Sequence, residues 1–136
     1  MRSLERTFVR PQTGQARLMD AEVSRSLRTA RAARLTKNEA LFREINERVH
    51  ALNDFGAHAE RFSIVCECGQ DTCADVIHVQ RDFYETVRGQ SDRFIVVNGH
   101  VLPEIEKVVE QHEGFAVVDK HDGIPEKIAA QTDPRA

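Results

Sequence analysis

The three cysteines of the chain are Cys66, Cys68 and Cys73, and all of them lie within one eight-residue segment. Cysteines that only fill a core are scattered along a sequence, whereas clustered thiols around a glycine, here Gly69, are typical of a metal knuckle. An odd number of closely spaced cysteines also disfavours a disulfide framework. Zinc requires a fourth ligand, and the chain offers six histidines. The segment therefore predicts a loop closed by zinc.

Length and composition indicate one soluble globular domain. The chain has 136 residues, of which 40% are hydrophobic and 30% charged, enough to bury a modest core. No apolar run approaches the length needed to span a membrane, and no segment resembles a signal peptide. We therefore expect a cytoplasmic protein that does not contact a membrane.

The charges are distributed unevenly. Residues 1–36 contain eight arginines and three acidic residues, a net charge of +5, while the remaining residues carry −8. A basic arm on an acidic body suits contact with nucleic acid or with an acidic protein surface. The alternatives are a solubilising tail and an arm that folds back on its own acidic body. The arm's candidate contact residues have a three-residue spacing: Arg25, Arg28, Arg31 and Arg34.

The sequence pattern predicts three segments. Residues 1–35 form a basic arm that is largely disordered or partly helical, residues 36–120 a zinc-stabilised domain, and residues 121–136 a flexible tail. Thr36 and Glu39 form a capping box, which predicts a helix beginning there. The core face of that helix is expected to be its apolar positions: Leu41, Phe42, Ile45, Val49 and Leu52.

Short β-rich runs and helical patterns alternate after this helix. Helices are expected over residues 80–88 and 103–114, the second beginning near Pro103 and ending at Gly114. The expected strands are 62–65, 76–79, 94–97 and 115–118. The fold class is therefore α+β, a small three- to four-stranded sheet with two or three helices and a zinc knuckle.

The fourth zinc ligand has several candidates. His78 is close in sequence, but an extended chain of about 3.3 Å per residue would place it about 16 Å from Cys73. His100 follows the third expected strand. If that strand runs parallel to the one that ends at Cys66, both ends reach the same edge of the sheet, and Gly99 gives the backbone room to approach. His100 is the preferred ligand; His78, His112 and the absence of a protein ligand remain alternatives.

Several segments together resemble a family of small actinobacterial-type proteins that has no assigned activity. The resemblance covers about residues 36–120. It implies the ligand set Cys66, Cys68, Cys73 and His100, and it says nothing about the arm. The similar segments are residues 38–48 (Asn-Glu-Ala-Leu-Phe-Arg-Glu-Ile-Asn-Glu-Arg), the Cys-Glu-Cys knuckle, residues 93–100 (Arg-Phe-Ile-Val-Val-Asn-Gly-His) and residues 114–120.

The predicted site favours a non-catalytic role. Three thiolates and an imidazole leave zinc no open position for water, and the chain has no phosphate-binding Gly-rich loop, deaminase motif or nucleophile elbow. No small-molecule substrate is identified. We expect a zinc-binding regulatory or adaptor module whose arm contacts nucleic acid or a transcription or translation assembly.

Two alternatives concern the thiols. The first is a redox or metal sensor that releases zinc on oxidation. The second replaces zinc by an iron–sulfur cluster, which the short spacing from Cys68 to Cys73 and the following Ala74-Asp75 disfavour. Glu67, between two ligands, is expected to face solvent.

Overall fold

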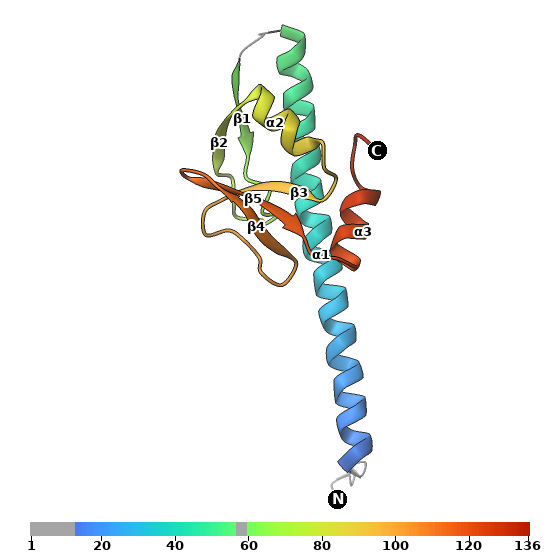
Figure 1. Cartoon of the computed structure of the whole chain (residues 1–136). Coiled ribbons are helices and arrows are strands. Elements are labelled where there is room, and N and C mark those ends of the chain that lie inside the picture. Colours follow the sequence, from blue (N-terminus) through green and yellow to red (C-terminus); the bar gives the residue numbers. More distant parts are fainter. Residues whose placement is uncertain (1–12, 57–59) are drawn as a thin grey trace, which may run out of the picture. The chain divides into compact units, whose positions relative to one another are not determined.

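The computed structural model describes residues 13–56 and 60–136 (Figure 1). It is α+β, with three helices and two small antiparallel sheets among the described residues. The chain divides into two compact units, Met1–Arg31 and Ala32–Ala136. The disorder expected for residues 1–12 lies outside the described residues. The elements are α1 (Thr13–Gly56), β1 (Arg61–Val65), β2 (Val76–Gln80), α2 (Arg81–Arg88), β3 (Arg93–Val97), β4 (Glu106–Gln111), β5 (Phe115–Lys120) and α3 (Ile124–Gln131).

Helix α1 begins earlier than the capping box predicted. Thr36 lies inside the helix, where its hydroxyl donates to the carbonyl of Ala32 at 2.8 Å instead of capping an N-terminus. The preceding residues are mainly alanine, arginine and leucine, which are strong helix formers, so the helix continues through the predicted start. Glu39 does not cap either, because its side chain is fully buried against Lys120.

The strands form two sheets instead of one. β1 and β2 are an antiparallel hairpin joined by the cysteine loop, while the second sheet has the order β3-β5-β4. β1 and β3 therefore lie in different sheets, so the condition considered for His100, two parallel strands of one sheet, is not met. The helix expected over 103–114 is wrong, because β4 forms there and pairs with β5. Ile105, Val108 and Val109 fit a helical spacing, but β-branched residues beside an available strand favour pairing.

Buried residues of both sheets, of the cysteine loop, of α2 and of α3 form one apolar core cluster. It takes alternate residues from β1 and β2, and consecutive residues from the central part of β3 and β5. The largest fully buried apolar side chains in it are Tyr84, Phe94, Ile64, Ile95, Val87, Val96 and Val117.

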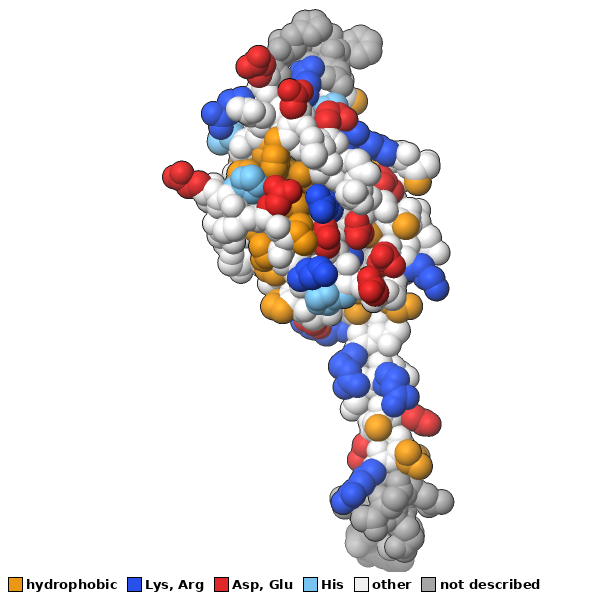
Figure 2. Space-filling model, in the orientation of Figure 1, with side chains coloured by type: hydrophobic (Ala, Val, Ile, Leu, Met, Phe, Trp, Pro, Cys, Tyr) orange, Lys and Arg blue, Asp and Glu red, His pale blue; other side chains and the backbone are white. Residues whose placement is uncertain are grey.

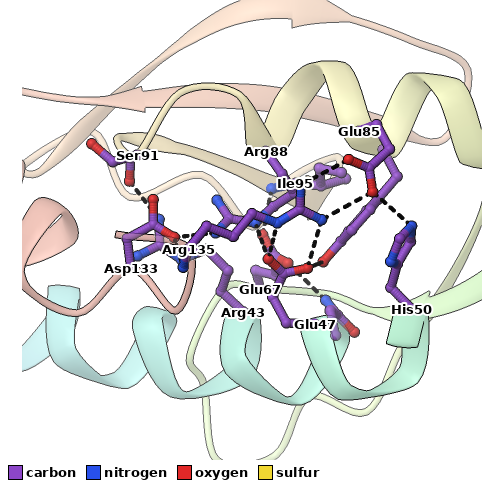
Figure 3. Close-up of polar contacts among 12 residues, drawn as sticks. Arg43, Glu47, His50, Glu67, Glu85, Arg88, Ser91, Ile95, Asp133 and Arg135 are labelled. Atoms are coloured by element: carbon purple, nitrogen blue, oxygen red, sulfur yellow. Dashed lines mark hydrogen bonds and ion pairs between the residues drawn. The ribbon is translucent and has the colours of Figure 1, made fainter. Parts of the chain in front are cut away.

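The C-terminal segment is ordered, contrary to the expected flexible tail. α3 has Pro125 in its first turn, packs against β5 and buries Ala129. Charged groups hold the residues that follow it (Figure 3). Asp133 pairs with the buried Arg88, and Arg135 donates to Glu85 at 2.8 Å. The polar composition of this segment therefore reflects ion pairing with the body.

Helix α1 packs with its polar side inward. Leu41, Ile45 and Leu52, predicted to face the core, are 57%, 40% and 73% exposed. The other two residues of the predicted core face, Phe42 and Val49, are only half-buried. The buried positions are instead Thr36, Glu39, Ala40, Arg43, Asn46 and His50.

The body explains this inversion, because it presents polar groups to the helix. Arg43 donates to the backbone carbonyls of Ser91 and, at 2.8 Å, of Ala129. Buried polar groups cost free energy unless they find partners, so the helix face that can supply donors and acceptors turns inward.

Figure 2 shows basic and acidic side chains interspersed over the face of the body that it draws.

Two basic side chains lie over the ring of Phe94. The guanidinium of Arg43 and the ammonium of Lys120 each lie 4.2 Å from the centroid of its ring. Lys120 also contacts the carboxylates of Glu39 and Glu106, and all three side chains are fully buried. Burial lowers the pKa of Lys120, and burial raises the pKa of Glu106 to about 7. Burial therefore acts against the charged form of both Lys120 and Glu106.

Replacing Lys120 by methionine should lower the free energy of unfolding by about 3 to 5 kcal/mol, because two buried carboxylates would lose their cation. Lys107→Met is the matched control, since Lys107 is exposed on β4. Urea unfolding of both variants would measure the difference. Equal stability of the two variants would show that the buried cluster contributes nothing.

Candidate metal centre

The structure brings the four predicted ligands together in one group. The Sγ atoms of Cys66, Cys68 and Cys73 and a ring nitrogen of His100 all lie within 4.8 Å of one another. Two of these residues are buried and two are half-buried. Among the described residues this cluster could hold a metal ion.

The three cysteines lie in the loop between β1 and β2, and His100 lies in the connection after β3. Cys66 follows β1, where its N–H donates to the carbonyl of Asp75 at 2.9 Å and extends the hairpin ladder. The chain then turns, with the Cys73 N–H donating to the Gln70 carbonyl at 3.0 Å, and this turn brings the Cys73 thiol close to the other two thiols. His100 lies in the turn after β3, with its N–H on the carbonyl of Val97 at 2.9 Å.

The distances suit a single tetrahedral ion. Nδ1 of His100 lies 3.6 Å from Sγ of Cys66 and 3.5 Å from Sγ of Cys73. A zinc ion about 2.3 Å from sulfur and about 2.0 Å from nitrogen places such atoms about 3.6 Å apart. Nδ1 is therefore the ring nitrogen placed to bind such an ion. Nε2 points to the Asp75 carboxylate at 3.8 Å, in the position where metal-binding histidines commonly find an acidic neighbour.

Burial disfavours the ionised form of two of the three thiols. Burial raises the pKa of the Cys66 thiol and of the Cys68 thiol. Backbone amides act in the opposite direction, since the Val97 N–H donates to Sγ of Cys66 at 3.1 Å. Zinc binding would therefore release protons, and its affinity should rise with pH until the thiols are ionised.

Glu67 is buried, contrary to the expectation that it faces solvent. Its Oε1 accepts the Ile95 N–H at 2.9 Å, while its own N–H donates to the Ile95 carbonyl at 2.9 Å. Oε2 accepts from Asn46 at 2.7 Å. Burial raises the pKa of Glu67, and these hydrogen bonds oppose that shift. Glu67 thus joins the knuckle to β3, and this contact brings His100 to the cysteines.

Asn46 extends the same connection to α1. Its amide donates to the Val65 carbonyl and accepts the Val65 N–H, both at 2.8 Å. The Asn46 side chain therefore makes both backbone hydrogen bonds of Val65, the last residue of β1, as a neighbouring strand would. Sequence reasoning missed both Asn46 and Glu67. One signal was available in the sequence: polar residues of α1 recur at helical spacing on the side opposite its apolar stripe. This spacing could have indicated a polar helix face that packs against the rest of the domain.

Gly69 lets the knuckle approach the backbone of α1. Its φ is +72°, and a Cβ there would lie 2.8 Å from the Glu39 nitrogen and 2.9 Å from the carbonyl carbon of Asn38. Neither helix backbone atom can move away without disturbing the helix. A residue with a side chain would therefore push the knuckle off the helix.

The other histidines have different neighbours. His78 lies on the exposed side of β2, with Nδ1 2.9 Å from the Ser63 hydroxyl. His112 stacks on Phe115 at 4.8 Å between ring centroids. His50 is buried and forms a 2.8 Å contact with Glu85. The four candidate arginines of the arm are all exposed on α1.

Comparison with known proteins gives no match to any family model, curated protein or solved structure. None of the described helices is sufficiently long and apolar to cross a membrane. The fold and the site together define a small α+β protein with a Cys3His group that could bind a metal ion.

Gly69→Ala should destabilise the protein more than Gly99→Ala. Both glycines have positive φ, which costs alanine about 1–2 kcal/mol at either position. Only at Gly69 would the new Cβ also meet the backbone, since nothing lies within 4 Å at Gly99. The extra cost should be about 1–3 kcal/mol in urea unfolding. Equal losses for the two variants would contradict the close approach.

Proposed function

We propose that this chain is a non-catalytic zinc-binding module in which the ion has a structural role. The observation that carries the proposal is the set of four donor atoms within 4.8 Å of one another. Three thiolates and one imidazole complete a tetrahedral zinc shell, so no position remains for a water molecule or substrate. A regulatory or adaptor role, acting through surfaces that the zinc holds in place, fits this arrangement.

The places in the fold from which the ligands come support a structural role. Cys66 and Cys73 belong to the β1–β2 hairpin, whereas His100 belongs to the connection after β3 in the second sheet. An ion bound by all of them links two sheets that share no strand pairing. Such a site does not exist in the unfolded chain, so the free energy of binding zinc contributes to folding.

The same distances favour one ion over an iron–sulfur cluster. A two-iron cluster divides its four ligands between two metals, so ligands on different irons lie farther apart than ligands around one ion. The ligand atoms here are all mutually close, and two S···N separations of 3.5 and 3.6 Å match a single zinc.

His100→Ala should lower zinc affinity by more than the roughly 10–100-fold typical of losing a residue that only supports a ligand. His78→Ala is the matched control and should retain zinc, because His78 contacts Ser63 and not the cysteines. Metal content by mass spectrometry, with an absorption spectrum and a thermal melt, would measure this.

The other outcomes of this experiment are equally informative. A wild-type protein that binds no zinc, or that loses it through His78→Ala, would contradict the proposed site. Iron with visible absorption would indicate a cluster. Release of zinc by mild peroxide would assign the alternative function, a thiol-based sensor.

We further propose that the arm contacts nucleic acid through phosphate groups. Arg25, Arg28, Arg31 and Arg34 are exposed on α1 at a spacing of three residues, and basic side chains stand out on the helix of the N-terminal unit (Figure 2). On a helix this spacing produces a slowly winding basic stripe. The stripe contains no aromatic residue, so phosphate contact is favoured over base stacking.

Binding of a fluorescent duplex DNA should weaken steeply with salt, with a slope of log K against log salt near −3.6 if four phosphates are contacted. Arg25→Gln with Arg28→Gln should remove about half of that slope. Lys107→Gln with Lys127→Gln is the control, since both lysines are exposed on the acidic body. Absent or salt-insensitive binding would contradict the proposal and leave an acidic protein surface as the arm's partner.

A further inference from the structure

Strand β2 has an outer edge that no other strand covers within residues 13–56 and 60–136. In its sheet it pairs with β1 alone. The Cys66 N–H donates to the Asp75 carbonyl, and the hydrogen bonds of an antiparallel ladder alternate from that pair onward. The backbone groups of Val76 and His78 therefore point away from β1. Such a row of N–H and C=O groups is a template for an added strand.

The outer edges of the other strands are bonded or interrupted. The side chain of Asn46 bonds the edge of β1, and Glu67 bonds the edge of β3. β4 has a shift of register and carries the charged residues Lys107 and Glu110, and both features oppose strand addition. β2 has a continuous register with β1 and no acidic residue, lysine or arginine. Its exposed residues are Val76, His78 and Gln80.

A groove of about 460 Å³ lies against β2, on the side to which the connection between β4 and β5 also extends (Figure 1). Val97 and Phe115, which pair at the ends of β3 and β5, are apolar parts of its lining. Val76, which is 53% exposed, lines it from β2. Ligand pockets have volumes of about 300 to 1,000 Å³, so this groove has room for apolar side chains of a bound segment.

The groove carries opposite charges at the two ends of β2. Asp75 directly precedes the strand, and its side chain is 56% exposed. Arg61 is exposed and lies opposite Gln80, the last residue of β2. An extended segment with an acidic residue at one end and a basic residue at the other would place each charge beside its opposite.

We infer that β2 and this groove bind an extended segment of a partner protein by strand addition. The segment bonds the backbone of Val76 and His78, and its alternate side chains enter the groove. It runs antiparallel to β2, so an acidic residue beside Arg61 comes first, apolar residues follow, and a basic residue beside Asp75 comes last. The groove is lined by none of the four proposed metal ligands, so the inference is independent of the zinc proposal.

Fluorescence anisotropy with the purified full chain would test the inference. The probe is a labelled peptide with blocked ends and the order Glu-Thr-Phe-Thr-Val-Thr-Lys, in which alternate side chains share one side. Val76→Lys should weaken its binding at least about tenfold, because a charge enters the edge strand. Val108→Lys is the matched control, since Val108 on β4 is 43% exposed and lies outside the groove. Circular dichroism would show that both variants fold.

Backbone pairing has a separate test. N-methylation of the peptide's Phe and of the Thr after it removes two consecutive donors, one of which faces β2, and keeps every side chain. The methylated peptide should bind roughly tenfold more weakly. On addition of the unmodified peptide, hydrogen exchange measured by NMR should slow at the N–H groups of Val76 and His78.

A charge exchange tests the direction of the segment. At low salt, Arg61→Glu should weaken binding of the probe at least about threefold, and a peptide with Lys in place of its Glu should restore it. Failure of this exchange to restore binding would overturn the antiparallel direction. Absence of binding at millimolar peptide, equal losses for Val76→Lys and Val108→Lys, or unchanged exchange at Val76 and His78 would overturn the whole inference.

Discussion

The buried carboxylate of Glu67 is the contact on which the structure depends. It receives hydrogen bonds from β3 and from α1 and stands between two cysteines. No strand pairing joins the hairpin of the first sheet to the second sheet, so this carboxylate links the two together with the Glu67–Ile95 backbone hydrogen bond and the shared apolar core. The metal ligands, the core and the docking of α1 therefore share one polar anchor. A buried charge is costly, and here several hydrogen bonds offset that cost at the point where the segments meet.

Polar contacts also hold the rest of the inward side of α1. Its inward side pairs with Lys120 at one end, with carbonyls of β1 and α3 in the middle, and with charged groups from α2 farther along. Ion pairs and side-chain-to-backbone hydrogen bonds hold this helix, whereas the sheets and α2 are joined by apolar packing. The protein thus combines a conventional apolar core with a polar interface along its longest helix. Polar interfaces of this kind specify one arrangement, because a shifted helix would leave buried groups without partners.

Much of this could be predicted from the sequence, and the failures have a common cause. The α+β class and the metal knuckle follow from short-range patterns, since strand runs and thiol spacing are local. The orientation of α1 does not, because it depends on what the body offers to the helix. Glu67 and Asn46 were missed for the same reason. β4 was mistaken for a helix because Ile105, Val108 and Val109 have a helical spacing, and the pairing with β5 that makes this segment a strand is not visible in that spacing.

The order of the ligands along the chain has a consequence for how the domain assembles. Three thiols lie in one short loop, while His100 follows Cys73 by 27 residues. The loop can collect the ion through local contacts alone, which close quickly. The imidazole can join only after β3 has docked on Glu67. In the proposed zinc-bound form, completion of the coordination shell would therefore require docking of the second sheet, and a chain in which that sheet had not docked would hold the ion through sulfur alone.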